Sequence, residues 1–377
     1  MDIFESLENR GHEQVVFSSD PDTGLRAIIA IHDTTLGPAL GGCRMWNYKK
    51  ESDALRDVLR LSKGMTYKAA VAGLDLGGGK SVIIGNSKTM KNEYLFRSFG
   101  RFVQGLGGRY ITAEDVGTSV SDMEWVRRET KYVTGISRAL GGSGDPSPVT
   151  ALGTFTGMKA CVKKVFGSDS LNGRKIAIQG MGHVGTYLVE LLYKAGAKLY
   201  VSDIDEDKLK SVAKKYACKV VNNDKIYELD VDIFAPCAMG GIINDDTIPK
   251  LKCAIIAGAA NNQLEKEKKH GKALLDKGIL YAPDYVINAG GLINVYNELQ
   301  GYNRERALTQ AEDIYRILTD VLDYAEKEGV PTPIASNKYA EERIKSIRRL
   351  KRTFIGEKKI YIERRQDRSA DSRRKKP

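Results

Sequence analysis

Two lysines and an aspartate are the residues of this 377-residue chain best suited to proton transfer. Lys68 extends an apolar helical stripe, Lys80 follows three consecutive glycines, and Asp115 comes just after a short apolar run. A second cation nearby and partial burial both disfavour a protonated ammonium, so one of the two lysines could titrate near neutrality and act as a base. The plainer interpretation, three unrelated surface charges, stays open, because spacing alone does not bring the three side chains together.

The glycines before Lys80 are similar to the end of a phosphate-binding loop, but their spacing is wrong. That loop needs a glycine at position 74, which is leucine here, so the sequence excludes a nucleoside-triphosphate site. The glycines still indicate that the backbone closely approaches another part of the molecule and presents Lys80 there.

A glycine pattern in the second half of the chain is typical of a dinucleotide site. Residues 180–185 read GMGHVG, follow an expected strand and open an expected helix. Gly180 permits a tight turn, Gly182 lets the backbone approach a pyrophosphate at the helix N-terminus, and Gly185 allows close packing of helix on strand. A glycine turn without a ligand is the alternative, and the flanking strand and helix favour the dinucleotide site.

Asp203 indicates which dinucleotide is bound. It ends the next expected strand, 23 residues after Gly180. Its carboxylate would accept hydrogen bonds from the adenosine ribose and repel a 2′-phosphate, and no cation follows in Ile204-Asp205. The sequence therefore predicts NAD rather than NADP.

These residues need strands and helices to position them. Apolar runs in the first half predict strands at 14–17, 26–32, 81–84 and 110–112. We expect a helix capped by Ser52 and a second helix with an apolar stripe over residues 95–106. After a Gly-, Ser- and Pro-rich linker at 141–148, a helix over 151–166 precedes strands at 175–179, 198–202, 231–234, 254–257 and 279–282. Alternating strands and helices predict an α/β fold, with a doubly wound parallel sheet covered by helices on both faces.

Composition places the chain among ordinary globular proteins of about two domains, with 42% hydrophobic and 28% charged residues. The five cysteines include no C-x-x-C pair and the four histidines fall at no metal-ligand spacing. We therefore expect neither a disulfide framework nor a metal site, and a cytoplasmic location fits. The polar, acidic N-terminus is not a signal peptide, and no apolar run is long enough to span a membrane.

The formal net charge of +11 is unevenly distributed. Residues 357–377 hold nine Lys/Arg and four Asp/Glu, a net +5. Tyr361 is the only aromatic residue among them, so the tail offers no interleaved stacking platform for bases. We expect a basic, flexible tail and no specific nucleic-acid partner.

Several longer segments resemble the amino-acid dehydrogenase family that includes enzymes for glutamate, leucine, phenylalanine and valine, with leucine-type members the nearest. The resemblance runs from residue 1 to about 355. It rests on 32–42 (HDTTLGPALGG), 63–68 (KGMTYK), 77–80 (GGGK), 112–117 (TAEDVG), 146–150 (PSPVT), 235–238 (APCA), 258–263 (GAANNQ) and 281–291 (YAPDYVINAGG). It implies reversible oxidative deamination of an L-amino acid to its 2-oxo acid and ammonia, with NAD taking the hydride.

The resemblance also implies a role for individual residues. Lys68 would bind the substrate carboxylate with the Gly41-Gly42 backbone, Lys80 would be the low-pKa lysine that activates water, and Asp115 would carry protons to and from the substrate nitrogen. The cofactor would be held at the adenosine ribose by Asp203, at the nicotinamide end by Thr150 and Asn262, and elsewhere by Gly180, Gly182, His183, Val184, Gly185 and Ala238. The substrate side chain would lie among Leu40, Met65, Ala113, Leu292 and Val295.

This expected pocket is apolar, and Leu40 stands where glutamate-specific members place a lysine, so glutamate is disfavoured. A branched-chain aliphatic amino acid, leucine first, is favoured over phenylalanine or tryptophan. One methylene in an apolar pocket discriminates by only about 1–3 kcal/mol, so the aromatic alternative stays open. A catalytically silent NAD-binding regulator would lack one of Lys68, Lys80 and Asp115, and all three are present.

The resemblance finally implies two domains around a cleft and a homo-oligomer such as an octamer. A substrate-binding and oligomerisation domain would comprise residues 1–145, completed by C-terminal helices at about 325–356. An NAD-binding domain would comprise residues 146–324.

Overall fold

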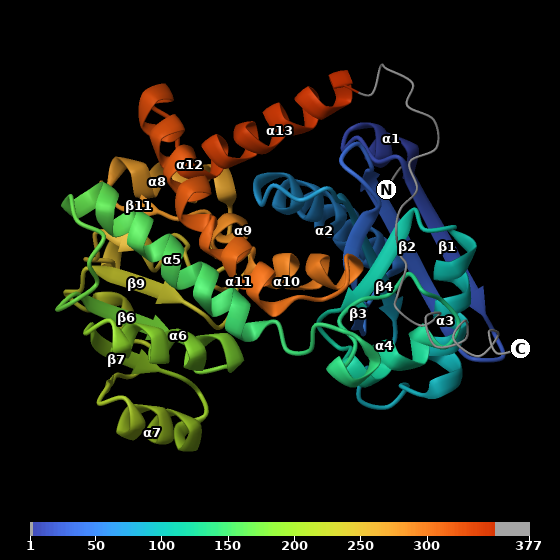
Figure 1. Cartoon of the computed structure of the whole chain (residues 1–377), viewed down its shortest axis with the longest axis horizontal. Helices are drawn as coiled ribbons and strands as arrows, with labels where there is room; N and C mark the ends of the chain where they lie inside the picture. Colours follow the sequence, from blue (N-terminus) through green and yellow to red (C-terminus); the bar gives the residue numbers. More distant parts are fainter. Residues whose placement is uncertain (1–2, 351–377) are drawn as a thin grey trace, which may run out of the picture.

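The computed structural model describes residues 3–350, which form two lobes with one β-sheet each (Figure 1). The first lobe has a five-stranded mixed sheet in the order β1-β2-β4-β3-β5. β2 pairs antiparallel with β1 and β4, whereas β3 pairs parallel with β4 and β5. The strands are β1 (Gln14–Asp20), β2 (Leu25–Asp33), β3 (Ala39–Trp46), β4 (Gly77–Ile84) and β5 (Tyr110–Glu114).

Helices cover both faces of this sheet. The helices of the first lobe are α1 (Ile3–Glu8), α2 (Glu51–Val71), α3 (Glu93–Gly105) and α4 (Val120–Arg127). The long helix α2 buries Leu55 and Val58 against Ile28 and Val82 on one face. α3 and α4 pack on the opposite face, where Asn92 caps α3 by accepting the amide of Leu95 at 2.9 Å.

Three features of this lobe differ from the prediction. α2 begins at Glu51 and its N-cap is Lys50, so Ser52 lies inside the first turn and caps nothing. β4 begins at Gly77, so the glycines and Lys80 belong to a strand rather than to the loop before it. The sequence does not predict β3 at all, because its two central glycines lack the branched side chains that favour strands.

The second lobe has a six-stranded, wholly parallel sheet in the order β11-β10-β9-β6-β7-β8. Ile176 and Ile178 of β6 face one apolar cluster and Ala177 faces another, so both faces of the sheet are covered, as predicted. The strands are β6 (Lys175–Gln179), β7 (Lys198–Ser202), β8 (Lys219–Val220), β9 (Ile233–Pro236), β10 (Ile255–Ile256) and β11 (Leu280–Tyr281). The α-helices are α5 (Ser147–Phe166), α6 (His183–Lys194), α7 (Glu206–Lys215), α8 (Glu267–Asp276), α9 (Asp284–Ile287), α10 (Gly290–Leu299), α11 (Arg304–Glu312), α12 (Ile314–Glu328) and α13 (Thr332–Leu350).

Two late helices connect the lobes (Figure 1). α10 packs on α5, and its Leu292 and Ile293 share an apolar cluster with Leu40 of β3. α13 packs on α12 and α8 at one end and reaches the first lobe at the other, where Arg343 donates to the carbonyl of Leu74 at 2.8 Å. The region expected to complete the first domain thus touches both lobes, and residues 351–356 and the basic tail lie outside the described residues.

The linker predicted at 141–148 contains no strand or α-helix until α5 begins at Ser147. It is held by Glu298 of α10, whose buried carboxylate accepts the amides of Gly135 at 3.0 Å and Ser143 at 2.9 Å. The segment between the lobes is therefore anchored at its start to a helix that both lobes contact.

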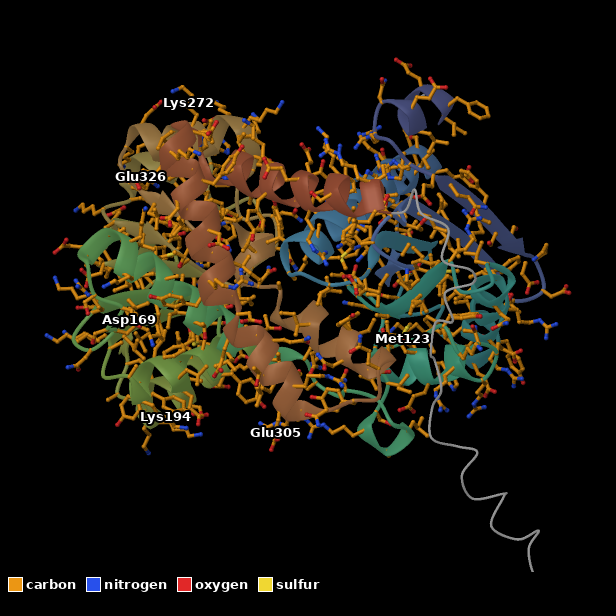
Figure 2. The ribbon with its side chains drawn as sticks, turned by 45° about the horizontal axis from the view of Figure 1, so that its top comes forward. Met123, Asp169, Lys194, Lys272, Glu305 and Glu326 are labelled. Carbon is orange, nitrogen blue, oxygen red and sulfur yellow. The ribbon has the colours of Figure 1, made fainter. Side chains whose placement is uncertain are left out.

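Charged side chains gather on the outside of the second lobe. Figure 2 shows Asp169, Lys194 and Lys272 at its rim, where the two lysines are exposed and Asp169 is partly buried. In the range 3–350, no helix has both the length and the apolar character that crossing a membrane requires.

Candidate active site

A cleft of about 1390 Å³ lies between the two lobes. From the first lobe it is lined by β3, α2, Lys80 in the middle of β4 and the carboxyl end of β5, and from the second by the segments that follow β9, β10 and β11. In parallel α/β sheets the carboxyl ends of strands are the usual place for ligands. The predicted residues that line it are Leu40, Gly42, Met65, Lys68, Lys80, Ala113, Asp115, Thr150, Val184, Asn262, Leu292 and Val295.

The glycines of β4 bring α2 onto the sheet. A methyl group at Gly78 would overlap the hydroxyl and amide of Thr66 in α2, and one at Gly79 would meet the ring of Tyr110 at 2.6 Å. Only glycine therefore lets α2 lie this close to β4. As a result, Lys68 of α2 and Lys80 of β4 reach the same cleft.

Asp115 lies between two cations. Its Oδ2 is 2.9 Å from Nζ of the buried Lys80 and accepts a hydrogen bond from Nε of Arg44 at 3.0 Å. Burial alone would raise the pKa of Asp115, but the two cations outweigh it and hold that pKa below its usual value. Asp115 is therefore an ionised proton acceptor in direct contact with a lysine.

Lys68 is held by an amide rather than by a carboxylate. Its Nζ donates to Oδ1 of Asn288 at 2.7 Å, and Nδ2 of Asn288 donates in turn to Asn261 at 2.8 Å. Burial lowers the pKa of Lys68 to about 8, while the nearby Asp284 partly opposes the shift. A substrate carboxylate would provide the anionic partner that this enclosed ammonium lacks.

The apolar part of the cleft lies beside these charges. Leu40 and Leu292 are buried in one cluster, against which Met65 and Val295 pack. Ala113 of β5 lines the same cleft two residues before Asp115. The predicted pocket residues thus come from both lobes, so movement of one lobe against the other would change the size of the pocket.

The glycine motif after β6 has the geometry that a dinucleotide needs. Gly180 has φ +104°, and a side chain on Gly185 would overlap the carbonyl of Gly180, so both positions require glycine. The site of a side chain on Gly182 is open space, where a pyrophosphate fits at the N-terminus of α6. Asp203 accepts the backbone amides of Met181 and Asp205 at the end of β7.

The remaining predicted residues have different surroundings. Gly41 lies against β4 rather than in the lining of the cleft, and its carbonyl accepts a hydrogen bond from Tyr110 at 2.6 Å. His183 is largely exposed, and Ala238 contacts the turn at Gly180. Asn262 has φ +51°, a conformation rare outside glycine that is often found at functional sites.

One group of possible metal ligands includes Glu265, which also lines the cleft. The group offers one carboxylate oxygen from each of Asp245 and Glu265 and one ring nitrogen from His270. These three atoms lie within 4.8 Å of one another. Nδ1 of His270 accepts the amide of Lys266 at 3.0 Å, so the neutral ring carries its proton on Nε2, which faces Asp245 at 3.4 Å. A protonated ring nitrogen does not bind a metal, so this geometry does not favour a metal site.

Comparison with family models places this cleft in a known class of enzymes. The model described as "Glu/Leu/Phe/Val dehydrogenase, dimerisation domain" matches residues 12–132. The model described as "Glutamate/Leucine/Phenylalanine/Valine dehydrogenase" matches residues 141–207 and 200–351. The chain belongs to this dehydrogenase family. The resemblance inferred from the sequence motifs and the predicted α/β fold are both confirmed.

Individual relatives cover nearly the whole dehydrogenase chain. Leucine dehydrogenase of Thermoactinomyces intermedius is 55% identical over 362 residues, which are 96% of this chain and 99% of the relative. Phenylalanine dehydrogenase of Lysinibacillus sphaericus is 51% identical over 91% of both chains. The crystal structure of L-tryptophan dehydrogenase from Nostoc punctiforme has a TM-score of 0.83 at 50% identity, covering 92% of this chain and all of that one.

The structure of this dehydrogenase corrects one interpretation and adds residues that the sequence did not reveal. Lys80 and Asp115 are not unrelated surface charges, because they form an ion pair in the cleft. Arg44 and Asn288 were not predicted to belong to the site. Arg44 lies two residues after Gly42 and so on the same face of β3, a signal that depends on recognising β3 as a strand.

Proposed function

We propose that this dehydrogenase catalyses the reversible NAD-dependent oxidative deamination of branched-chain aliphatic L-amino acids, with leucine preferred. The observation that carries the proposal is one cleft that combines Lys68, Lys80 and Asp115 with an apolar pocket. The amino acid, NAD⁺ and water would be converted to the 2-oxo acid, ammonium, NADH and a proton. The 2-oxo acid and the amino acid are the small-molecule partners of the site.

NAD would lie with its pyrophosphate on Gly182, its adenosine ribose at Asp203 and its nicotinamide end near Thr150 and Asn262. When bound there, NAD accepts the hydride that leaves the substrate Cα. Gly180, His183, Val184, Gly185 and Ala238 would complete the surroundings of the cofactor. The open space at Gly182 and the carboxylate of Asp203 support this placement.

Lys68 would bind the substrate carboxylate, assisted by the backbone of Gly42, which lines the cleft, whereas Gly41 does not line it. The pairing would stabilise the protonated form of Lys68, whose pKa burial lowers to about 8 in the free enzyme. A fixed carboxylate would limit the motion of the substrate and so help to hold Cα against the nicotinamide ring.

Asp115 and Lys80 would move the protons. Hydride loss requires an uncharged amine, and Asp115 would accept the proton of the substrate ammonium. Lys80, after releasing its own ammonium proton to solvent, would then take a proton from water as the water oxygen attacks the imine carbon. Asp115 would return a proton to the departing nitrogen. The ion pair between Lys80 and Asp115 places the two groups within reach of one substrate atom.

The side-chain pocket would hold a medium-sized apolar group among Leu40, Met65, Ala113, Leu292 and Val295. A second carboxylate would be uncompensated there, which disfavours glutamate. Relatives at 51% identity that are named for phenylalanine and tryptophan favour an aromatic amino acid as the second candidate. The 55% identity to leucine dehydrogenase supports the aliphatic one.

Substrate choice is tested by kcat/KM for NADH formation with L-leucine, L-valine, L-isoleucine, L-phenylalanine, L-tryptophan and L-glutamate. We expect leucine or a branched relative to lead and glutamate to be inactive. A higher kcat/KM for phenylalanine or tryptophan would replace the aliphatic assignment by the aromatic one and leave the mechanism in place.

The same proposal includes a homo-oligomer, such as an octamer, and a role in branched-chain amino-acid catabolism in the cytoplasm. The family model that matches residues 12–132 is described as a dimerisation domain. β1 is an edge strand, and its Phe17 is 56% exposed. A strand that has no partner on its outer side within residues 3–350, and that carries an exposed aromatic side chain, supports pairing with a second copy.

A further inference from the structure

Arg44 connects Asp115 to a second carboxylate, that of Asp57 on α2. Its Nε donates to Asp115 at 3.0 Å, and its Nη1 donates to Asp57 at 2.9 Å. Its side chain is only 21% exposed. The planar guanidinium can make these two contacts at once, which a lysine ammonium at the same place could not do with the same geometry.

Asp57 is itself held in place. The hydroxyl of Tyr48 donates to Asp57 Oδ2 at 2.7 Å, and Arg60 donates to Asp57 Oδ1 at 3.1 Å. Burial alone would raise the pKa of Asp57, but Tyr48 and the two arginines hold it below its usual value. The far end of Arg44 therefore rests on a fixed anion.

The two cations that contact Asp115 both lie at the same carboxylate oxygen. Lys80 and Arg44 both contact Oδ2, and within residues 3–350 no hydrogen bond reaches Oδ1. Oδ1 is thus the oxygen available to a substrate proton. Lys80 can lose its proton during a reaction and then no longer holds Asp115, whereas an arginine stays charged at any working pH.

We infer that Arg44, held by Asp57 and Tyr48, is the positioning residue that keeps the Asp115 carboxylate oriented while Lys80 exchanges its proton. This inference rests on the proposed deamination, in which Asp115 is the proton acceptor. Arg44 itself touches no reacting atom in this account. It acts through Asp115, so its removal should alter the orientation and the acidity of that one group.

The acidity of Asp115 depends on charges from every element around it. β3, β4 and α2 contribute cations, whereas α2, β5, α4 and the linker contribute anions. Arg44, Lys80, Lys68 and Glu114 interact with Asp115 itself, whereas Asp57 pairs with Arg44, and Asp122 and Asp145 act on Glu114. Arg44 and Lys80 alone touch Asp115 among these, so removing Arg44 leaves one direct cation.

The test compares the full-length parent with R44M, R44K and D57N, and with R56M as a matched control. Arg56 is an exposed arginine on α2, and its Nη2 lies 3.7 Å from Oδ1 of Asp53. The readouts are kcat and KM with L-leucine and NAD over a range of pH, the melting temperature, and a crystal structure of R44M. D57N keeps Arg44 and nearly the same shape, so it tests the account even where R44M folds poorly.

We expect R44M to lower kcat about 10²-fold, as a displacement of order 1 Å in a reacting group does, with little change in KM. Loss of the cation should move the acidic limb of the pH profile up by about one unit. R44K should restore the position of the acidic limb but not the full kcat. The kcat of D57N should lie between those of R44M and the parent. R56M should match the parent in both kcat and pH profile.

An active parent whose R44M variant keeps both kcat and pH profile would overturn the inference and leave the proposed function intact. A parent that forms no NADH would refute the proposed function instead. In that case the R44M crystal structure still decides: a displaced Asp115 carboxylate supports the positioning role, and an unchanged one contradicts it.

Discussion

The two lysines of the cleft differ in their partners, and this difference assigns them different tasks. Lys80 contacts the carboxylate of Asp115, whereas Lys68 contacts the amide of Asn288. A lysine in contact with a carboxylate can exchange a proton with it. A lysine held by a neutral amide is a better receptor for an external anion, because no resident anion has to be displaced.

A pH dependence of carboxylate binding follows for Lys68. Because its pKa lies near 8 in the free enzyme, below its ordinary value, the anion-binding ammonium is lost as pH rises through 8. The inhibition constant of 4-methylpentanoate, which has no amine of its own, should therefore rise about tenfold per unit well above that pH.

Arginine at this position stays charged across the range. The K68R variant should show a flat pH profile of 4-methylpentanoate inhibition, which separates Lys68 from other titrating groups. An inhibition constant of the parent that stays level up to pH 10, roughly the ordinary pKa of lysine, would contradict the assigned role.

At the scale of elements, the glycines of β4 decide how close α2 lies to the sheet. The G78A variant would place a methyl group against Thr66 and should lower the free energy of unfolding by about 1–3 kcal/mol. It should also weaken binding of 4-methylpentanoate, because Lys68 moves with α2. Urea denaturation and inhibition assays measure the two effects.

Gly64 of α2 provides the matched control. Nothing lies within 4 Å of a side chain added there. G64A should raise the free energy of unfolding by about 0.5–1 kcal/mol, since alanine is the better helix former. A G78A variant as stable as the parent would show that α2 can shift without cost.

The end of β7 makes a prediction about the cofactor. Removing the carboxylate in D203A takes away the proposed acceptor for the adenosine ribose and the repulsion of a 2′-phosphate. KM for NAD should rise about tenfold, as loss of one or two charged hydrogen bonds does, and the ratio of NADP to NAD turnover should increase. Initial rates with both cofactors measure this, and an unchanged ratio would be evidence against Asp203 as the selecting residue.

Sequence patterns predicted some of these elements better than others. α3 follows from local periodicity, because its apolar spacing determines which side is buried, whereas β6 follows from a short apolar run that is buried on both faces. β3 does not, since its glycines favour a strand only once β4 and β5 lie on either side. The placement of Lys68 and Lys80 in one cleft depends on the close approach of Gly78 to Thr66. No local sequence pattern predicts that approach.

At the scale of the whole molecule, the cleft is made by two lobes that α10 and α13 connect. The pocket residues Leu40 and Leu292 come from different lobes and share one cluster. Closing of the lobes would exclude water from the reacting atoms before the hydride leaves. Motif resemblance predicted this two-part arrangement, whereas the contact of α13 with both lobes required the structure.

Self-association can be tested at the free edge of the first lobe. F17K places a charge on the exposed face of β1 and should reduce the number of subunits, measured by light scattering after size-exclusion chromatography. Leu275 is an exposed residue of α8 in the other lobe. L275K therefore serves as a control and should leave the number of subunits unchanged. A parent that runs as a monomer would refute the proposed oligomer.

In the proposed function, this cleft oxidises a branched-chain amino acid through Lys80 and Asp115. The most direct measurement is NADH formation from L-leucine and NAD by the parent, K80M and D115N, with NADH binding followed by fluorescence. We expect turnover by the parent and a loss of about 10²–10⁴-fold in each variant, with NADH binding retained. The proposed function would be contradicted if either variant formed NADH as fast as the parent. It would also be contradicted if the parent bound NADH but formed none from L-leucine.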